Sequence, residues 1–339
     1  MELEKTKTSL KTRIVDLLMK IGPLLALIIL SLVLTIASDK FFRYGNFMNI
    51  LKQASINSLI SAGMLTVLIT AGIDLSVGSN CVLASCVMGV LVQAGVTNIF
   101  VLITAALITG FAVGYLNGIL LTKLDLPHPF VSTMGMKNIT LGIALLITNA
   151  TPIGFQGAGV DGLLWLGSAT IGGFPVSFIF VIIIFVFFHI FLSKMDLGRQ
   201  IYCIGGNAEA ARLSGINTAR ALRIAYTISG VMAAIAGIVL VGRVSSANAM
   251  AGTTYDSDAI AACIIGGASF NGGKGTIWGT LVGSLLIAVI RNGLNLLGAK
   301  NDLQYIVIGV VIIFAVTIDI FREKAELKAR KMATELSRS

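Results

Sequence analysis

Long apolar segments recur along almost the whole chain, and this succession limits the possible folds more than any other feature of the sequence. A bilayer core about 30 Å thick requires about 20 apolar residues per helix, and the backbone groups of a crossing segment must be satisfied inside it. The segments lack the alternating pattern that membrane strands require. We therefore predict an all-α polytopic membrane protein with about ten transmembrane helices, at residues 21–38, 55–72, 76–94, 98–121, 129–148, 175–193, 222–241, 256–270, 275–292 and 303–321.

The composition supports this prediction and leaves little room for a soluble domain. Hydrophobic residues make up 56% of the 339 residues and charged residues only 12%, whereas about 25% of the residues in a soluble domain are charged. The 37 glycines suit helices that approach closely in lipid. We predict a short N-terminal tail (1–20), one transmembrane domain (21–321) and a C-terminal tail (322–339).

Basic residues indicate which ends of the helices face the cytoplasm. With the N-terminus inside and ten crossings, 18 of the 25 Lys and Arg residues fall in cytoplasmic segments and five outside, as the positive-inside rule requires. Both termini are then cytoplasmic. The net charge of +9 reflects this topology, because nucleic-acid binding would need one basic face. The first apolar segment also fits a secretory signal, but we interpret it as an uncleaved anchor.

One mid-chain segment, residues 193–223, is polar and basic, with five Lys or Arg against two Asp or Glu. Within it, residues 208–214 are predicted to form a short amphipathic helix, on which Glu209 and Arg212 share a face because they are three residues apart. Such a helix on the positive side of the membrane suits contact with a partner protein. A solvated turn is the alternative interpretation.

Glycine-rich breaks interrupt the apolar pattern at residues 71–78 and 266–275. Irregular backbone at membrane depth is tolerated only where protein or water satisfies it, and paired breaks can mark a transport pathway. Asp74 and Ser76 in the first break are therefore candidate pathway residues. Alternatively, the break is a tight turn in which the Asp74 carboxylate caps the next helix.

The sequence also excludes several classes of function. The second break is not a phosphate-binding loop, because Ala268 and Gly275 occupy positions that this motif reserves for glycine and a hydroxyl residue. No catalytic pattern appears, so no enzyme is predicted. No metal site is predicted, because the two histidines are isolated and the four cysteines lack a CxxC spacing. No carboxylate lies well inside a predicted span, which argues against coupling to protons or sodium. Arg291 is expected to be a snorkelling anchor or a solute contact.

Five motifs resemble one known family. They are Ile69–Gly78 (ITAGIDLSVG), Ile204–Asn217 (IGGNAEAARLSGIN), Asp258–Ala262 (DAIAA), Gly266–Gly283 (GGASFNGGKGTIWGTLVG) and Gly293–Gly298 (GLNLLG). Together they resemble the permease subunits of bacterial monosaccharide ABC importers of the ribose, galactose and allose type. The resemblance extends from about residue 40 to about residue 320, in the family's order and spacing.

This resemblance implies an ABC importer permease bundle in the bacterial inner membrane, which forms a homodimer with a second permease copy or a heterodimer with a near copy. The implied partners are an ATPase subunit with two nucleotide-binding domains, which binds the ATP, and a periplasmic sugar-binding protein that delivers a monosaccharide. The permease itself then needs no cofactor. The resemblance assigns the ATPase-coupling role to the loop at about 194–221, through Gly205, Gly206, Asn207, Glu209, Ala210, Arg212 and Gly215.

A neutral sugar needs no charged conduit, and selectivity could lie mainly in the binding protein. Candidate residues along the pathway are, besides Asp74 and Ser76, the polar residues Asn57, Ser61, Asn117, Asn292 and Asn295. Amides in membrane helices often bond neighbouring helices instead. The alternatives are a permease of the same family that carries another sugar-like solute or a signalling molecule, and an ion-coupled secondary transporter.

Overall fold

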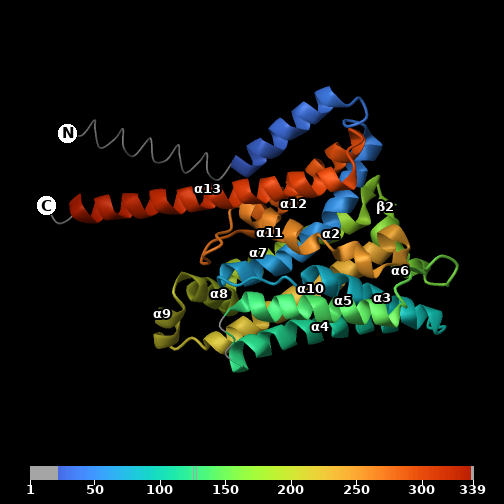
Figure 1. Cartoon of the computed structure of the whole chain (residues 1–339), viewed down its shortest axis with the longest axis horizontal. Helices are drawn as coiled ribbons and strands as arrows, with labels where there is room; N and C mark the ends of the chain where they lie inside the picture. Colours follow the sequence, from blue (N-terminus) through green and yellow to red (C-terminus); the bar gives the residue numbers. More distant parts are fainter. Residues whose placement is uncertain (1–21, 125, 127, 337–339) are drawn as a thin grey trace.

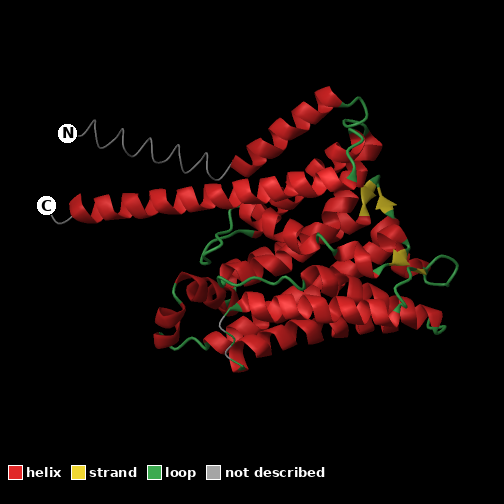
Figure 2. Ribbon diagram, in the orientation of Figure 1, coloured by secondary structure: helices red, strands yellow, loops and turns green. Residues whose placement is uncertain are grey.

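The computed structural model describes residues 22–124, 126 and 128–336 of the chain, so the predicted tail 1–20 lies outside the described residues. The described part is almost entirely helical, as predicted (Figure 2). A helix occupies each predicted span: Gly22–Ala37, α2 (Tyr44–Ile69), α3 (Val77–Gln93), α4 (Ile99–Lys123), α5 (Pro129–Ile147), α7 (Val176–Lys194), α10 (Thr218–Val244), α11 (Tyr255–Ile265), α12 (Ile277–Leu296) and α13 (Asn301–Leu336).

The lengths of several helices differ from those of the predicted spans. Among the described residues, five helices (α4, α5, α7, α10 and α12) are long and apolar enough to cross a membrane by length and composition alone. α2 begins well before residue 55, and α13 continues into the predicted C-terminal tail. α11 has only 11 residues, about 16 Å at 1.5 Å per residue. It is therefore too short to cross a bilayer and gives way to the second glycine-rich break.

Short elements occupy the connections. They are α6 (Asp161–Ser168), α8 (Asp196–Gly206), α9 (Ala208–Leu213) and the 3-10 helix η1 (Ala249–Gly252). β1 (Ile153–Gly154) pairs antiparallel with β4 (Ser246–Ala247), and β2 (Thr170–Ile171) pairs antiparallel with β3 (Phe174–Pro175). α8, α9 and the C-terminal end of α13 lie at one end of the bundle, and α6 and β2 lie at the other (Figure 1).

α2 and α10 form the centre of the bundle. The most apolar part of α10 is 72% buried, whereas the corresponding part of α4 is 28% buried, and every α2 residue from Ala54 to Ile69 is buried. The exposed large apolar side chains lie mainly on helix Gly22–Ala37, α4, α5, α7 and α13. Because a membrane protein turns apolar side chains toward lipid as well as toward its core, these outer helices present the expected lipid-facing surface.

Glycines allow α4 and α10 to touch. A Cβ on Gly230 would overlap the carbonyl oxygen of Gly110 and would lie 2.8 Å from two backbone atoms of Gly114. Small residues permit such close crossings in membranes, where packing replaces the hydrophobic effect between helices. The backbones of α4 and α10 therefore meet without intervening side chains.

We expect Gly230→Val to destabilise the bundle by more than the roughly 1–3 kcal/mol that overpacking a core usually costs, because the obstruction is backbone and cannot rotate away. Thermal denaturation of the detergent-solubilised protein measures this loss. Gly135→Val on α5 is the control, since a Cβ at Gly135 meets no atom within 4 Å. Equal melting temperatures for the two variants would contradict the close crossing.

Candidate functional site

The predicted partner-binding loop folds as two helices, α8 and α9. α9 begins where the Asn207 side-chain oxygen accepts a hydrogen bond of 2.9 Å from the Ala210 N–H, and this cap explains the start of so short a helix. Gly215 ends the segment with a positive φ of 85°, which glycine adopts without strain. The short helix predicted over 208–214 is therefore confirmed as a structural element.

α9 presents a charged pair to solvent. Arg212 donates to both carboxylate oxygens of Glu209, at 2.9 and 2.6 Å, as their spacing predicted. The Arg212 guanidinium lowers the pKa of the Glu209 carboxyl below its usual value. Beside this pair Leu213 is 74% exposed, and Ala210 is exposed as well. The outer face of α9 thus combines a fixed ion pair with an apolar side chain, a composition that suits contact with another protein.

Gly205 and Gly206 lie outside α9 and form the end of α8. A Cβ on Gly205 would overlap the carbonyl oxygen of Ile69, at the end of α2, and would lie 2.5 Å from the backbone nitrogen of Gly273 in the second break. The Gly273 N–H also donates to the Ile69 carbonyl, at 2.8 Å. We call this meeting of Ile69, Gly205 and Gly273 the three-way joint.

The three-way joint ties the loop to both glycine-rich breaks. The Tyr202 hydroxyl of α8 reinforces it with a hydrogen bond of 2.7 Å to the Gly275 carbonyl. Ala71 begins the first break with a positive φ of 62°, and a Cβ on Gly272 would lie 2.7 to 3.0 Å from its atoms. α8 is therefore in direct contact with the irregular backbone that follows α2 and precedes α12.

Asp74 is the centre of a buried hydrogen-bond network. Its Oδ1 accepts from the N–H and the hydroxyl of Ser76, at 3.0 and 2.6 Å, and from Asn117 of α4 at 3.5 Å. Its Oδ2 accepts from the Ser229 hydroxyl of α10 at 2.8 Å. Asn117 also donates to the Ser76 hydroxyl, at 2.9 Å. Three sequence candidates, Asp74, Ser76 and Asn117, are thus brought together.

The network differs from the helix cap that the sequence predicted for the Asp74 carboxylate. Asp74 accepts from the N–H of Ser76, which itself is the N-cap residue of α3 and makes no side-chain cap bond. Asp74 therefore forms a local turn and ties the first break to α4 and α10. Sequence reasoning missed Ser229 and also Tyr226, whose hydroxyl donates to the Ile73 carbonyl at 3.3 Å. Both lie in an apolar helix, where nothing in the local pattern separates them from other hydroxyl-bearing residues.

Two carboxylates at the start of α11 pair with cations from neighbouring helices. Asp256 lies 2.5 Å from the Lys137 ammonium of α5, and Asp258 accepts two hydrogen bonds from Arg291 of α12, at 3.0 and 2.7 Å. The expectation that Arg291 snorkels outward is wrong, because a buried carboxylate holds its guanidinium inside the protein. Asp74, Asp256 and Asp258 are all buried within the protein. Asp74 lies in the first glycine-rich break, and the other two lie in the first turn of α11, as expected from the sequence.

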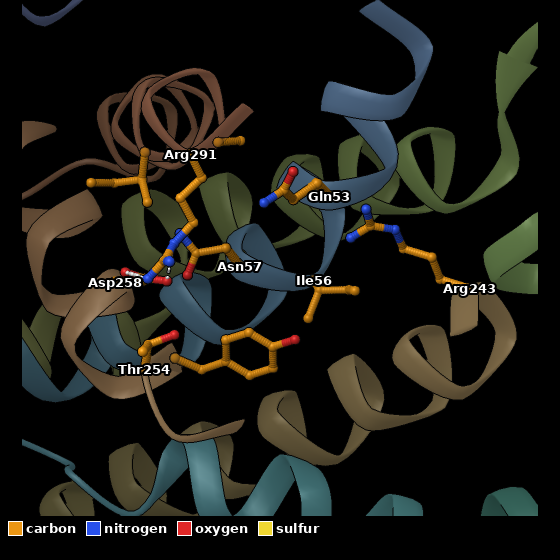
Figure 3. A pocket seen from close by; sticks show the side chains of 10 residues that line it. Gln53, Ile56, Asn57, Arg243, Thr254, Asp258 and Arg291 are labelled. Atoms are coloured by element: carbon orange, nitrogen blue, oxygen red, sulfur yellow. Dashed lines mark hydrogen bonds and ion pairs between the residues drawn. The ribbon is translucent and has the colours of Figure 1, made fainter. Parts of the chain in front are cut away.

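A cavity of about 160 Å³ lies beside the Arg291–Asp258 pair (Figure 3). Its lining comes from α2, from the end of α10, from the segment that starts α11 and from α12. Asn57 of α2 is 8% exposed, and neither amide atom has a hydrogen-bond partner among the described residues. The lining side chains belong to Gln53, Ile56, Asn57, Arg243, Thr254, Tyr255, Asp258, Ile287, Ala288 and Arg291.

The remaining candidate pathway residues lie elsewhere. Asn292 and Asn46 exchange hydrogen bonds of 3.0 and 2.8 Å, and Asn295 accepts one of 2.7 Å from Gln304. These amides join neighbouring helices and do not line the cavity. Ser61 is buried one turn further along α2 than Asn57, and its hydroxyl has no partner in the described part of the chain.

Comparison with known proteins agrees with this architecture. Residues 46–316 match the family described as "Branched-chain amino acid transport system / permease component", so the chain belongs to this family of membrane permeases. It is a transport component and not an enzyme.

Individual relatives are similar along almost their whole length. The ribose import permease protein RbsC of Escherichia coli (strain K12) is 41% identical over 304 residues, which cover 89% of this chain and 94% of the relative. RbsC of Bacillus subtilis (strain 168) is 38% identical over 321 residues, covering 94% and 98%. The D-allose transport system permease protein AlsC of Escherichia coli (strain K12) is 37% identical over 292 residues, covering 86% and 88%. No solved structure matches the chain significantly.

Proposed function

We propose that this chain is the permease subunit of an ATP-binding-cassette importer that moves a monosaccharide across the bacterial inner membrane. The family description names branched-chain amino acids, but the relatives at 37 to 41% identity are named for ribose and allose. A neutral sugar also fits a bundle whose buried charges largely pair with one another. Another sugar-like solute remains the alternative within the family.

The three-way joint is the observation that carries the transport mechanism. In our proposal, α9 docks on an ATPase subunit with two nucleotide-binding domains, and closure of those domains moves α9 and α8 together. Because Gly205 packs against Ile69 and Gly273, that movement reaches both glycine-rich breaks. The breaks adjoin α3 and α12, so their displacement shifts the helices between outward-open and inward-open arrangements.

The proposed assembly includes a second copy of the permease and a periplasmic sugar-binding protein on the side away from α9. α9 and the C-terminal end of α13 lie at the same end of the bundle (Figure 1). The segment 193–223, which contains α9, and the C-terminal part of α13 are both rich in basic residues, so the positive-inside rule supports a cytoplasmic location for this end. The opposite end, with α6 and the two short sheets, then faces the periplasm and receives the loaded binding protein.

Uptake of labelled sugar into proteoliposomes tests this function. The vesicles hold the permease with its ATPase subunit, and the sugar-loaded binding protein is added on the periplasmic side. Uptake should require ATP on the α9 side and should continue when the proton and sodium gradients are removed. Uptake that follows an ion gradient and ignores ATP would establish a secondary transporter instead.

Glu209→Lys is expected to reduce ATP-driven uptake at least about tenfold, which corresponds to about 1.4 kcal/mol, because it removes the carboxylate that fixes Arg212. The pair is exposed and contributes little to folding, so insertion and thermal stability should remain normal. Co-purification of the ATPase subunit measures docking directly. Asp196→Lys, at the exposed start of α8, is the charge-matched control. Equal uptake by the Glu209→Lys variant and the unmodified protein would exclude a coupling role for α9.

A further inference from the structure

The cavity beside α2 combines features that a sugar-binding site requires. A sugar hydroxyl both donates and accepts hydrogen bonds, so a polyol needs donors and acceptors together. The Arg291 guanidinium supplies donors, the Asp258 carboxylate supplies acceptors, and the Asn57 amide supplies both. Figure 3 shows Asn57, Asp258 and Arg291 converging from α2, α11 and α12.

The buried Asn57 amide has hydrogen-bonding groups that no described residue satisfies and that a ligand in the cavity could satisfy. A buried amide without partners costs on the order of 1–3 kcal/mol, and buried polar groups are almost always satisfied. Asn57 is more than nine-tenths buried, lines the cavity and has neither amide atom bonded within the described chain. A hydroxylated ligand in the cavity would satisfy the donor and the acceptor at once.

The Asp258 carboxylate retains capacity for a ligand although it is paired. Each of its oxygens accepts one hydrogen bond from Arg291, whereas a carboxylate offers about four acceptor sites. The ion pair also neutralises its own charge, so a neutral ligand can approach it. Ile56, Ile287 and Ala288 add apolar surface to the lining, which suits the C–H faces of a sugar ring.

The cavity lies where a sugar delivered from the periplasm would enter the bundle. α10 has 27 residues, about 40 Å at 1.5 Å per residue, and it begins next to α9. Arg243 lies in the last turn of α10 and lines the cavity. The cavity is therefore near the end of the bundle opposite α9, the end that receives the binding protein in the proposed function.

The cavity is small, which indicates weak binding. Its volume of about 160 Å³ is close to that of an engineered cavity of about 150 Å³ that binds benzene, and a pentose or hexose has about twice as many heavy atoms. Pockets for small-molecule ligands usually have about 300–1,000 Å³. A whole sugar ring therefore fits only when the helices that line the cavity move apart.

We propose that this cavity is a low-affinity monosaccharide site within the permease, where Asn57 and the Arg291–Asp258 pair hydrogen-bond neighbouring hydroxyls of the transported sugar. This inference rests on the proposed function and extends it. The permease itself then selects among solutes by the arrangement of their hydroxyl groups, after the binding protein has released the solute. Arg243 makes an anionic sugar the competing ligand, because its guanidinium donates a hydrogen bond of 3.4 Å to the neutral Asn49 amide and forms no ion pair with a carboxylate in the described part of the chain.

Direct binding to the permease–ATPase complex in lipid nanodiscs, without the binding protein, tests the proposal. The probes are D-ribose, D-allose and D-galactose, observed by saturation-transfer NMR at millimolar concentrations. At least one probe should bind saturably, and Asn57→Leu should weaken it about tenfold, because two hydrogen bonds of about 0.5–1.5 kcal/mol each are lost. If none of the probes binds, or if Asn57→Leu binds equally well, the site does not exist.

Ser284→Ala is the matched control. Ser284 is also buried and unpartnered in the described part of the chain and lies on α12, but it is absent from the cavity lining. Its replacement should leave sugar binding unchanged, and a loss equal to that of Asn57→Leu would assign the effect to general packing. D-Galacturonate separates the two ligand classes: tighter binding of this anion than of D-galactose would make the cavity an anion site and overturn the proposal.

A second variant keeps the test valid if Asn57→Leu fails to fold. Asn57→Cys, in a Cys203→Ser background that removes the exposed thiol, is treated with a membrane-impermeant thiol reagent from the side opposite α9. A saturating concentration of the bound sugar should slow labelling, and an unchanged rate would overturn the proposal. If uptake by the complete transporter is driven by ATP while no sugar protects the thiol, this inference alone fails. If uptake ignores ATP, the proposed function fails regardless of sugar binding.

Discussion

Gly205→Ala is expected to uncouple ATP hydrolysis from sugar uptake. The added methyl group would occupy the position of the Ile69 carbonyl oxygen and press on the backbone of Gly273, so α8 must separate from the two glycine-rich breaks. Since α9 itself is untouched, the ATPase subunit should still dock and hydrolyse ATP. Uptake of sugar per ATP hydrolysed should fall about tenfold or more, equivalent to at least about 1.4 kcal/mol.

The neighbouring Gly206→Ala variant is the steric control, because a Cβ there meets no atom within 4 Å. It should keep the melting temperature of the unmodified complex. Both uptake and ATPase activity are measured on the same proteoliposomes, so a loss of assembled complex is recognised by a parallel fall of both. Undiminished uptake by Gly205→Ala would mean that force reaches the bundle by another route.

Replacing Asp74 by alanine is expected to have the largest effect on stability. The change leaves three donors without their acceptor, namely the Ser76 N–H, the Ser76 hydroxyl and the Ser229 hydroxyl, and each buried unsatisfied group costs about 1–3 kcal/mol. The total approaches the whole stability of a typical domain, about 5–15 kcal/mol. We therefore expect little folded Asp74→Ala protein, measured as the monodisperse fraction after solubilisation and as the melting temperature.

Asp74→Asn distinguishes a structural role from an ionic one. The asparagine keeps one acceptor oxygen, and the Ser229 hydroxyl can rotate to accept from the new amide. Folding and ATP-driven uptake should therefore largely survive. A well-folded Asp74→Asn protein without any uptake would instead show that the negative charge takes part in transport, as an ion-coupled transporter requires.

Much of the fold was predictable because membrane helices follow one strong signal. A bilayer forces long apolar helices, so the all-helical class and the approximate position of each helix follow from hydropathy. α9 was predictable for a local reason, since the Glu209–Arg212 spacing and the polar surroundings are specific to a short amphipathic helix. The predicted span 256–270 extended beyond the end of α11 at Ile265, because Ala268 and Phe270 continue the apolar pattern on the far side of Gly266 and Gly267.

The candidate site was predictable only in part. Asp74, Ser76 and Asn117 are polar residues in apolar surroundings, and the structure assembles them into one network. Asn292 and Asn295 have the same local signature, yet their partners Asn46 and Gln304 come from neighbouring helices. The pairing of Arg291 with Asp258 depends on how α11 lies against α12. Such contacts depend on helix rotation, which hydropathy does not encode.

The central position of α2 has a consequence for biosynthesis. α2 is absent from the helices that length and composition alone would place across a membrane, and its inner stretch is enclosed by protein. α10, which packs along it, is synthesised about 150 residues later, roughly ten seconds or more after α2 at ribosomal speed. During that interval α7 is the one main neighbour of α2 that has been made, so the serines and asparagine of α2 are only partly enclosed. We therefore expect α2 to stay bound to the insertion machinery, or to membrane chaperones, until α10 is made.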